Sequence, residues 1–184
     1  MKPRERVLAA LAGRPVDRPP ASNPASVLTV ELMDLAGAPF PMACRNPNLA
    51  AELAATDHTE LGFDSVMPYF IIVQQSSALG CDVQWETKDN WPTVSMTRPL
   101  WRGPDDVNLA AGFLEHPDSS VVLRSIEIHR SEFRDDVAIV GKVVGLWTLG
   151  YQLLGVERFL MMTVDEPDMA ARCPDRLQEI AITF

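Results

Sequence analysis

Short apolar segments that end at Pro or Gly alternate along this chain with longer segments of helical periodicity, and this alternation constrains the fold most. The clearest short segment covers residues 137–140, which are mostly β-branched and are followed by Gly141. A second covers residues 63–67 and ends at Pro68. Such runs are typical of buried strands. Because strands separated by helices are joined in parallel, the pattern predicts an α/β fold.

Helical periodicity marks the segments between the strands. Residues 3–12 are expected to form a first helix, with Pro3 in its first turn. A long amphipathic helix is expected from Pro117 onward. Its stripe consists of Val122, Ile126, His129 and Phe133. Further helices are expected over residues 47–61, 70–79, about 148–164 and 167–182. Pro174 lies inside the last of these and is expected to kink or split it.

Two further segments are predicted to be extended. Residues 19–22 lie in a Pro-rich stretch and are the candidate first strand, and residues 83–97 alternate around a turn at 88–92, which predicts an inserted β-hairpin. Residues 1–184 are therefore expected to form a single domain, with residues 1–18 as a helical lead-in. About three parallel strands do not close a barrel, so we expect a part of a larger fold.

Composition excludes some classes of partner. The 184 residues carry 25 acidic and 16 basic side chains, a formal net charge of −9. No basic run offsets this charge, so binding to nucleic acid or to anionic lipid is not expected. No apolar stretch resembles a signal peptide or a membrane span. The three cysteines, Cys44, Cys81 and Cys173, are far apart and predict free thiols in a reducing cytoplasm.

Several motifs follow one another in an order that resembles a known family. The opening PRERVLAALAGRPVDRPP (residues 3–20) and GLWTL (145–149) resemble the uroporphyrinogen decarboxylase superfamily. The remaining motifs resemble its methylcobamide:coenzyme M methyltransferase branch: TVELMDLAG (29–37), LGFDSVMPYF (61–70), ALGCDV (78–83) and TKD (87–89). The resemblance implies the N-terminal half of a TIM-type (β/α)8 barrel whose members act on corrinoids or porphyrins.

The resemblance also implies zinc. Methyltransferases of this branch bind zinc through a His-x-Cys pair and a distant Cys in the second half of the barrel, and the metal holds the substrate thiol as a thiolate. The three histidines here, His58, His116 and His129, have no cysteine at ligand-like spacing. We interpret His58 as a helix-end residue and His129 as a packed one. The zinc ligands are therefore expected outside this sequence.

The decarboxylase function is the less favoured implication of the resemblance. That enzyme uses an arginine pair soon after its first strand and an aspartate after its second to hold the substrate. Here no arginine lies between Arg18 and Arg45, and no acidic residue lies between Ser65 and Ser77. Four substrate carboxylates would therefore lack cationic partners.

In a TIM barrel, ligands meet the carboxyl ends of the strands and the loops that follow them. The tip of the predicted hairpin adds one cationic residue, Lys88, to these candidate ligand contacts. The candidate ligand-binding residues are Asn23, Met67, Tyr69, Lys88, Gly145, Trp147 and Thr148. Each has a structural alternative: Asn23 an Asn-Pro turn, Tyr69 and Trp147 core packing, Thr148 a helix cap, and Lys88 a solvated turn.

The sequence and the resemblance predict three functions, in decreasing order of preference. The first is corrinoid-dependent methyl transfer to a thiol or a similar acceptor, by a chain that needs a second polypeptide or the second half of the barrel. The second is a non-catalytic module that binds a free corrinoid or a corrinoid protein. The third is a uroporphyrinogen decarboxylase. Because a half-barrel leaves strand edges open, we also expect the chain either to dimerise or to misfold alone.

Overall fold

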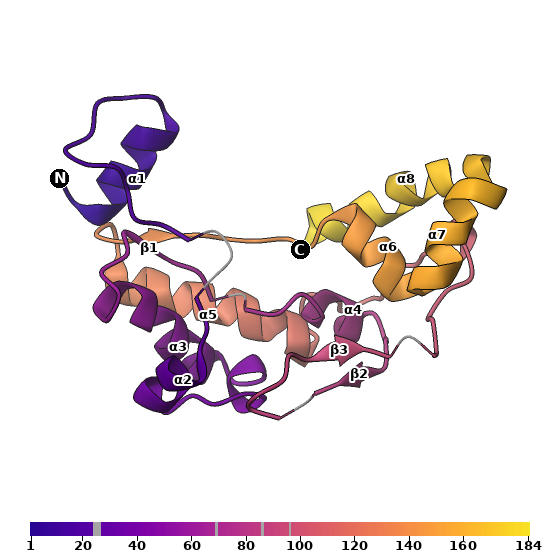
Figure 1. The fold of residues 1–184 in the computed structure, drawn as a ribbon, viewed down its shortest axis with the longest axis horizontal. Coiled ribbons are helices and arrows are strands. Elements are labelled where there is room, and N and C mark those ends of the chain that lie inside the picture. The colour runs from indigo at the N-terminus through magenta and orange to yellow at the C-terminus, as the bar shows by residue number, and fades with distance from the viewer. Residues whose placement is uncertain (24–26, 69, 86, 96) are drawn as a thin grey trace. The chain divides into compact units, whose positions relative to one another are not determined.

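The computed structural model describes residues 1–23, 27–68, 70–85, 87–95 and 97–184. The chain divides into two compact units, and Figure 1 labels the helices and strands that they contain. The first unit comprises Met1–Phe70, Thr87–Asp89 and Ser120–Lys142. The second comprises Ile71–Glu86, Asn90–Ser119 and Val143–Phe184.

The first unit contains helices around a short parallel strand pair. Its elements are α1 (Pro3–Leu11), α2 (Val30–Ala36), the 3-10 helix η1 (Met42–Cys44), α3 (Pro47–Thr59), β1 (Ser65–Val66), most of α5 (Pro117–Phe133) and β4 (Ala138–Ile139). The second unit consists of a hairpin and a group of three helices. Its elements are α4 (Gln74–Ala78), β2 (Val83–Gln84), β3 (Thr93–Val94), the 3-10 helix η2 (Pro104–Asp106), α6 (Leu146–Leu154), α7 (Val156–Asp165) and α8 (Pro167–Thr183).

Strands β1 and β4 pair in parallel, as the alternation predicted, with Ser65 opposite Ala138 and Val66 opposite Ile139. The expected first strand at residues 19–22 is not a regular strand in the structure. The segment does run beside β1, since the Asp64 N–H donates to the Ala21 carbonyl at 2.6 Å. Prolines at positions 19 and 20 have no N–H to donate, which limits the ladder that this segment can form.

The core of the first unit lies where α3 and α5 cover the strands. Small alanines on α3 and β-branched residues on α5 and β1 allow close packing; its fully buried members include Leu53, Ala54, Val66, Met67 and Val122. The predicted amphipathic helix is thereby confirmed in α5. Helix α2 was not expected from the sequence, because only seven residues separate its cap at Thr29 from the left-handed Gly37 (φ 61°) that ends it.

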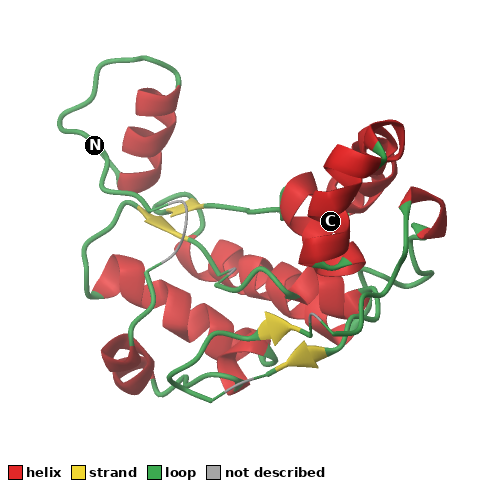
Figure 2. Ribbon diagram, turned by 45° about the vertical axis from the view of Figure 1, so that its right-hand side comes forward, coloured by secondary structure: helices red, strands yellow, loops and turns green. Residues whose placement is uncertain are grey.

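The predicted hairpin is confirmed in the second unit. Strands β2 and β3 pair antiparallel, with Val83 opposite Val94 and Gln84 opposite Thr93 (Figure 2). The helix predicted over residues 70–79 is shorter, since α4 covers only Gln74–Ala78.

The helices after β4 differ from the prediction in two places. The single helix expected at 148–164 is two helices, because Gly155 adopts φ 82°, which ends α6 and begins α7. Pro174 does not split α8, which continues across it. Pro174 is exposed, so the helical carbonyl that loses its N–H donor lies on the solvent side. In the described ranges no helix has both the length and the apolar character to cross a bilayer.

Candidate functional site

The carboxyl ends of the extended segments in the first unit gather at one edge. Ser22 Oγ lies 2.5 Å from Ser65 Oγ, so the residues after them, Asn23 and the end of β1, lie at the same end of the parallel pair. Asn23 is half-buried, whereas the Met67 side chain is fully buried and belongs to the core. The prediction for Tyr69 falls outside the described residues.

The amino end of β1 is occupied by an ion-pair cluster. The Asp64 carboxylate, 1% exposed, accepts hydrogen bonds from Arg6 (2.5 Å), from Arg18 (2.8 and 2.9 Å) and from the Ala21 N–H (2.8 Å). Burial by itself would raise the pKa of Asp64, but the hydrogen bonds from Arg18, Ala21 and Arg6 outweigh it and lower that pKa. This cluster ties the lead-in to the strand, and contacts at the amino face of a barrel serve stability rather than ligand binding.

Lys88, the candidate cation at the hairpin tip, forms an ion pair with Asp34 of α2. The Lys88 side chain is about one-third exposed and the Asp34 side chain is 64% exposed. An exposed pair of this kind contributes little stability, so Lys88 can exchange its partner for another anion at small cost.

The other three candidate residues lie together in the second unit, at the start of α6. Gly145 is the N-cap residue and is exposed, and no side chain caps the helix. The alternative role proposed for Thr148, that of a cap, is therefore wrong: Thr148 is the third residue of α6. Trp147 is 58% exposed, and its ring contacts the edge of Phe159 with centroids 4.9 Å apart. Its expected alternative role in the core does not hold.

The start of α6 offers backbone donors as well as an aromatic face. The first intrahelical hydrogen bond is donated by Leu149 to the Gly145 carbonyl at 3.0 Å. The N–H groups of residues 146–148 therefore precede the helical ladder and sit at the positive end of the helix dipole. Together with the Trp147 ring, this turn suits a flat ligand that carries carbonyl or anionic groups.

Sequence reasoning missed the buried polar residues behind this turn. Gln75 and Ser76 on α4 and Gln152 on α6 are all buried, at 0%, 0% and 3% exposure. Gln75 Oε1 accepts a hydrogen bond from the Val144 N–H at 2.9 Å. The available signal was the run of amides and hydroxyls, QQSS at 74–77, between apolar residues.

The potential zinc ligands among the described residues do not form a zinc site. The three cysteines are buried and form no disulfide among the described residues, and burial raises the pKa of the Cys81 thiol to about 11. His58 lies at the end of α3, where its Nδ1 is 2.6 Å from the Phe63 carbonyl oxygen, as expected of a helix-end residue. His129 is fully buried and stacks on Phe133, as expected of a packed residue. Over the residues that the structure describes, no three His, Cys, Asp or Glu side chains gather as a metal would require.

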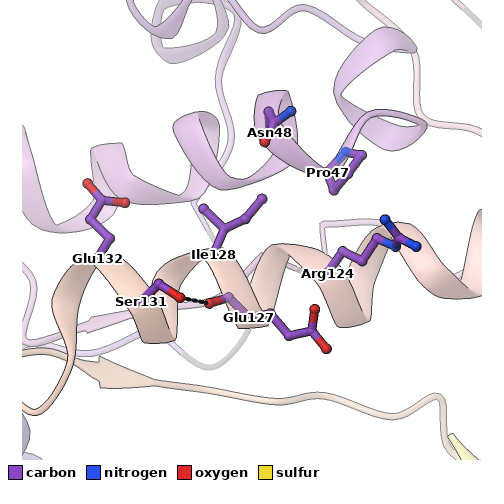
Figure 3. A pocket seen from close by; sticks show the side chains of 7 residues that line it. All are labelled: Pro47, Asn48, Arg124, Glu127, Ile128, Ser131 and Glu132. Carbon is purple, nitrogen blue, oxygen red and sulfur yellow. Dashed lines mark hydrogen bonds between the residues drawn. The ribbon is translucent and has the colours of Figure 1, made fainter.

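A groove on the first unit is lined by none of the seven candidate ligand-binding residues. It has a volume of about 680 Å³ and runs between the start of α3 and the outer face of α5. Figure 3 shows Ile128 projecting from α5 toward α3, with Arg124, Glu127 and Glu132 along the same helix. Its mixed charges and open shape do not select any one ligand class.

Comparison with known proteins gives consistent results. Methylcobamide:CoM methyltransferase MtaA of Methanosarcina barkeri is 34% identical over 180 residues, which are 97% of this chain and 52% of the relative. The methylated-thiol--coenzyme M methyltransferase of Methanosarcina mazei is 29% identical over 184 residues, covering 100% and 49%. A solved structure, a methyltransferase from Methanosarcina mazei, superimposes with a TM-score of 0.92 at 32% identity, covering 100% of this chain and 54% of that one.

The chain thus spans about half the length of the curated relatives it matches. Its fold is that of the corresponding part of a methyltransferase, consistent with a partial barrel. Residues 2–184 match the profile of the family described as Uroporphyrinogen decarboxylase (URO-D). This protein therefore belongs to the uroporphyrinogen decarboxylase family.

Proposed function

We propose that this chain is the corrinoid-binding part of a methyltransferase that moves a methyl group from a methylated corrinoid to a thiol. The observation that carries the proposal is the likeness, over the whole chain, to methylcobamide:CoM methyltransferases and to a solved methyltransferase. In such a transfer a thiolate attacks the methyl carbon, the sulfur–carbon bond forms, and the cobalt–carbon electron pair stays on cobalt.

The contribution proposed for this chain is binding and orientation. The exposed Trp147 ring would pack against the corrin plane, and the backbone donors at the start of α6 would bind carbonyl groups of its amide side chains. In the first unit, Asn23 is a separate candidate for a hydrogen bond to an amide side chain of a corrinoid. Lys88, now paired with Asp34, would bind the corrinoid phosphate or an acidic partner.

Porphyrinogen decarboxylation fits the arrangement less well. The nearest arginines before the predicted ligand face, Arg6 and Arg18, are paired with Asp64 at the amino end of β1. Their guanidinium groups are therefore engaged at the end of the strand opposite to the predicted ligand face. The same family fold would need other cations to hold four carboxylates.

Zinc, which the branch implies, does not fit the described residues of this chain. We propose that thiol activation depends on residues beyond those that the relatives share with this chain. The alternative, a module that binds a corrinoid or a corrinoid protein without chemistry, is favoured by the same lack of a donor set.

A titration with methylcobalamin tests the proposal. The full 184-residue chain is expected to bind methylcobalamin, measured by quenching of tryptophan fluorescence, and Trp147→Leu is expected to weaken binding about tenfold, as loss of one stacking aromatic should. Trp91→Leu is the matched control, because Trp91 is exposed to a similar extent, 54% against 58%. No saturable binding, or equal effects of the two substitutions, would contradict the proposal.

Turnover distinguishes the two functions. With 2-mercaptoethanesulfonate added, a chain able to transfer the methyl group by itself would convert the methylcob(III)alamin absorbance spectrum to that of cob(I)alamin under anaerobic conditions. Binding without this change is expected from the binding module, and it would move the search for thiol activation to a partner polypeptide.

We also propose that a second polypeptide covers the outer edge of β4. Parallel strands are normally buried on both faces, and Val137, Ile139 and Gly141 line a depression of about 270 Å³ with Arg4 and Arg130. A second copy is the simplest occupant. Light scattering over a hundredfold range of concentration is expected to give a dimer mass, and a folded monomer throughout would refute this.

A further inference from the structure

Buried polar side chains of one short segment contact α6 at two places. Gln75 accepts a hydrogen bond from the Val144 N–H at 2.9 Å, just before the helix begins. Further along, Gln152 Oε1 accepts from Ser76 Oγ at 2.5 Å, and Gln152 Nε2 donates to the Ile72 carbonyl at 3.1 Å. All these groups belong to the second unit. Residues 72–76 thus hold both the lead-in to α6 and its interior.

These contacts matter because nothing local fixes where α6 begins. Its N-cap is a glycine, and no side chain caps its first turn. A helix start without a cap frays, so its position must come from tertiary contacts. The buried Gln75 amide would be costly to leave unbonded, which makes its contact with Val144 a directed one rather than a chance approach.

We propose that Gln75 is a positioning residue for the turn 145–148. Its Oε1 holds the Val144 N–H so that the Trp147 ring and the first N–H groups of α6 face the ligand in one orientation, while the Ser76–Gln152 hydrogen bond keeps α6 from sliding along its axis. The identity of the ligand rests on the function proposed above, but the ordering of the turn does not.

Amide hydrogen exchange, followed by NMR on the full chain, tests the ordering directly. In the unsubstituted protein the Val144 amide is expected to exchange more than tenfold more slowly than the Trp147 amide, because the Val144 N–H has a buried acceptor whereas the Trp147 N–H precedes the helical ladder. Gln75→Met keeps the length of the side chain, removes the acceptor and is expected to speed Val144 exchange about tenfold. Ser77→Ala is the control, because it removes a hydrogen bond from the same helix to Asp118 instead.

Two readouts separate positioning from general destabilisation. The indole N–H signal of Trp147, assigned with Trp147→Phe, is expected to shift or broaden in Gln75→Met and not in Ser77→Ala. At a temperature where all variants are folded, methylcobalamin is expected to bind Gln75→Met at least about fivefold more weakly than Ser77→Ala.

The outcomes are distinguishable. Equal exchange at Val144 and Trp147 in the unsubstituted protein overturns the positioning role, and this measurement does not require any variant to fold. The same indole spectrum in Gln75→Met and Ser77→Ala also overturns it. If the unsubstituted protein does not bind methylcobalamin, the proposed function alone is overturned. The exchange and indole results still decide the role of Gln75.

Discussion

Two buried titratable groups in the first unit predict opposite pH dependences of stability. His129 is 0% exposed, and within the described structure neither ring nitrogen has a hydrogen-bond partner; the carboxylate of Glu132 lies 4.0 Å from Nδ1. Burial lowers the pKa of His129 to about 4. Asp57 on α3 is 1% exposed, and burial raises its pKa to about 6, although a backbone hydrogen bond from Val27 opposes the shift.

The signs follow from linkage between protonation and folding. An unfolded histidine titrates near pH 6.5, so between about pH 6.5 and 4 only the unfolded chain binds this proton, and the folded state loses about 3 kcal/mol as the pH falls. For Asp57 the folded state holds its proton up to about pH 6, while the unfolded carboxyl titrates near 3.9. That carboxyl therefore penalises the folded state by about 3 kcal/mol at neutral pH, and the penalty disappears as the pH falls.

Urea unfolding followed by circular dichroism from pH 4 to 7.5 separates the two groups. The unfolding free energy of His129→Leu, relative to that of the unsubstituted chain, is expected to rise by about 3 kcal/mol as the pH falls from 7 to 4. The relative unfolding free energy of Asp57→Asn is expected to rise by a similar amount as the pH increases from 4 to 7. Val122→Ala, on the same helix as His129, removes no titratable group, so its difference from the unsubstituted chain should be independent of pH. Differences for His129→Leu and Asp57→Asn that are flat with pH would refute the reasoning.

Three further outcomes are expected. Asp64→Ala leaves two guanidinium groups without their shared carboxylate and should lower the unfolding free energy by about 3 kcal/mol in urea titrations at pH 7, whereas an effect below 1 kcal/mol would mean that the cluster is screened by solvent. Gly150→Ala places a Cβ 2.5 Å from the Phe159 ring and should lose about 1–3 kcal/mol, while Gly141→Ala, with no atom within 4 Å, should lose much less, as thermal unfolding can measure. The Cys81 thiol, buried and with a pKa of about 11, should react with Ellman's reagent at pH 8 only after unfolding, and fast reaction of the folded chain would contradict its burial.

The elements that depend on neighbouring residues were predictable. The spacing of Val122, Ile126 and His129 predicted α5, and the alternation around residues 88–92 predicted the hairpin, because these patterns reflect contacts between residues a few positions apart. The start of α6 was predicted as a ligand-facing turn from its motif. What that motif did not contain was the cause of its order, a glutamine 69 residues earlier in the chain.

Packing decided the features that the sequence left open. Gly155 is compatible with a helix interior or with a break, and only the packing of α6 and α7 on each other, with Phe159 against Gly150, selects its positive-φ conformation. Likewise, Asp64 is one of many acids in the sequence, and it becomes an anchor because Arg6 and Arg18 converge on it from the lead-in.

The amino-acid sequence by itself determined the family and the parallel α/β pattern, since periodicity and motifs are local properties of the chain. The tertiary structure decided which polar groups are buried and which partners they meet, as with Gln75 and Val144 or His129 without a partner. Burial and long-range hydrogen bonds depend on which elements pack together, and no window of neighbouring residues contains that information.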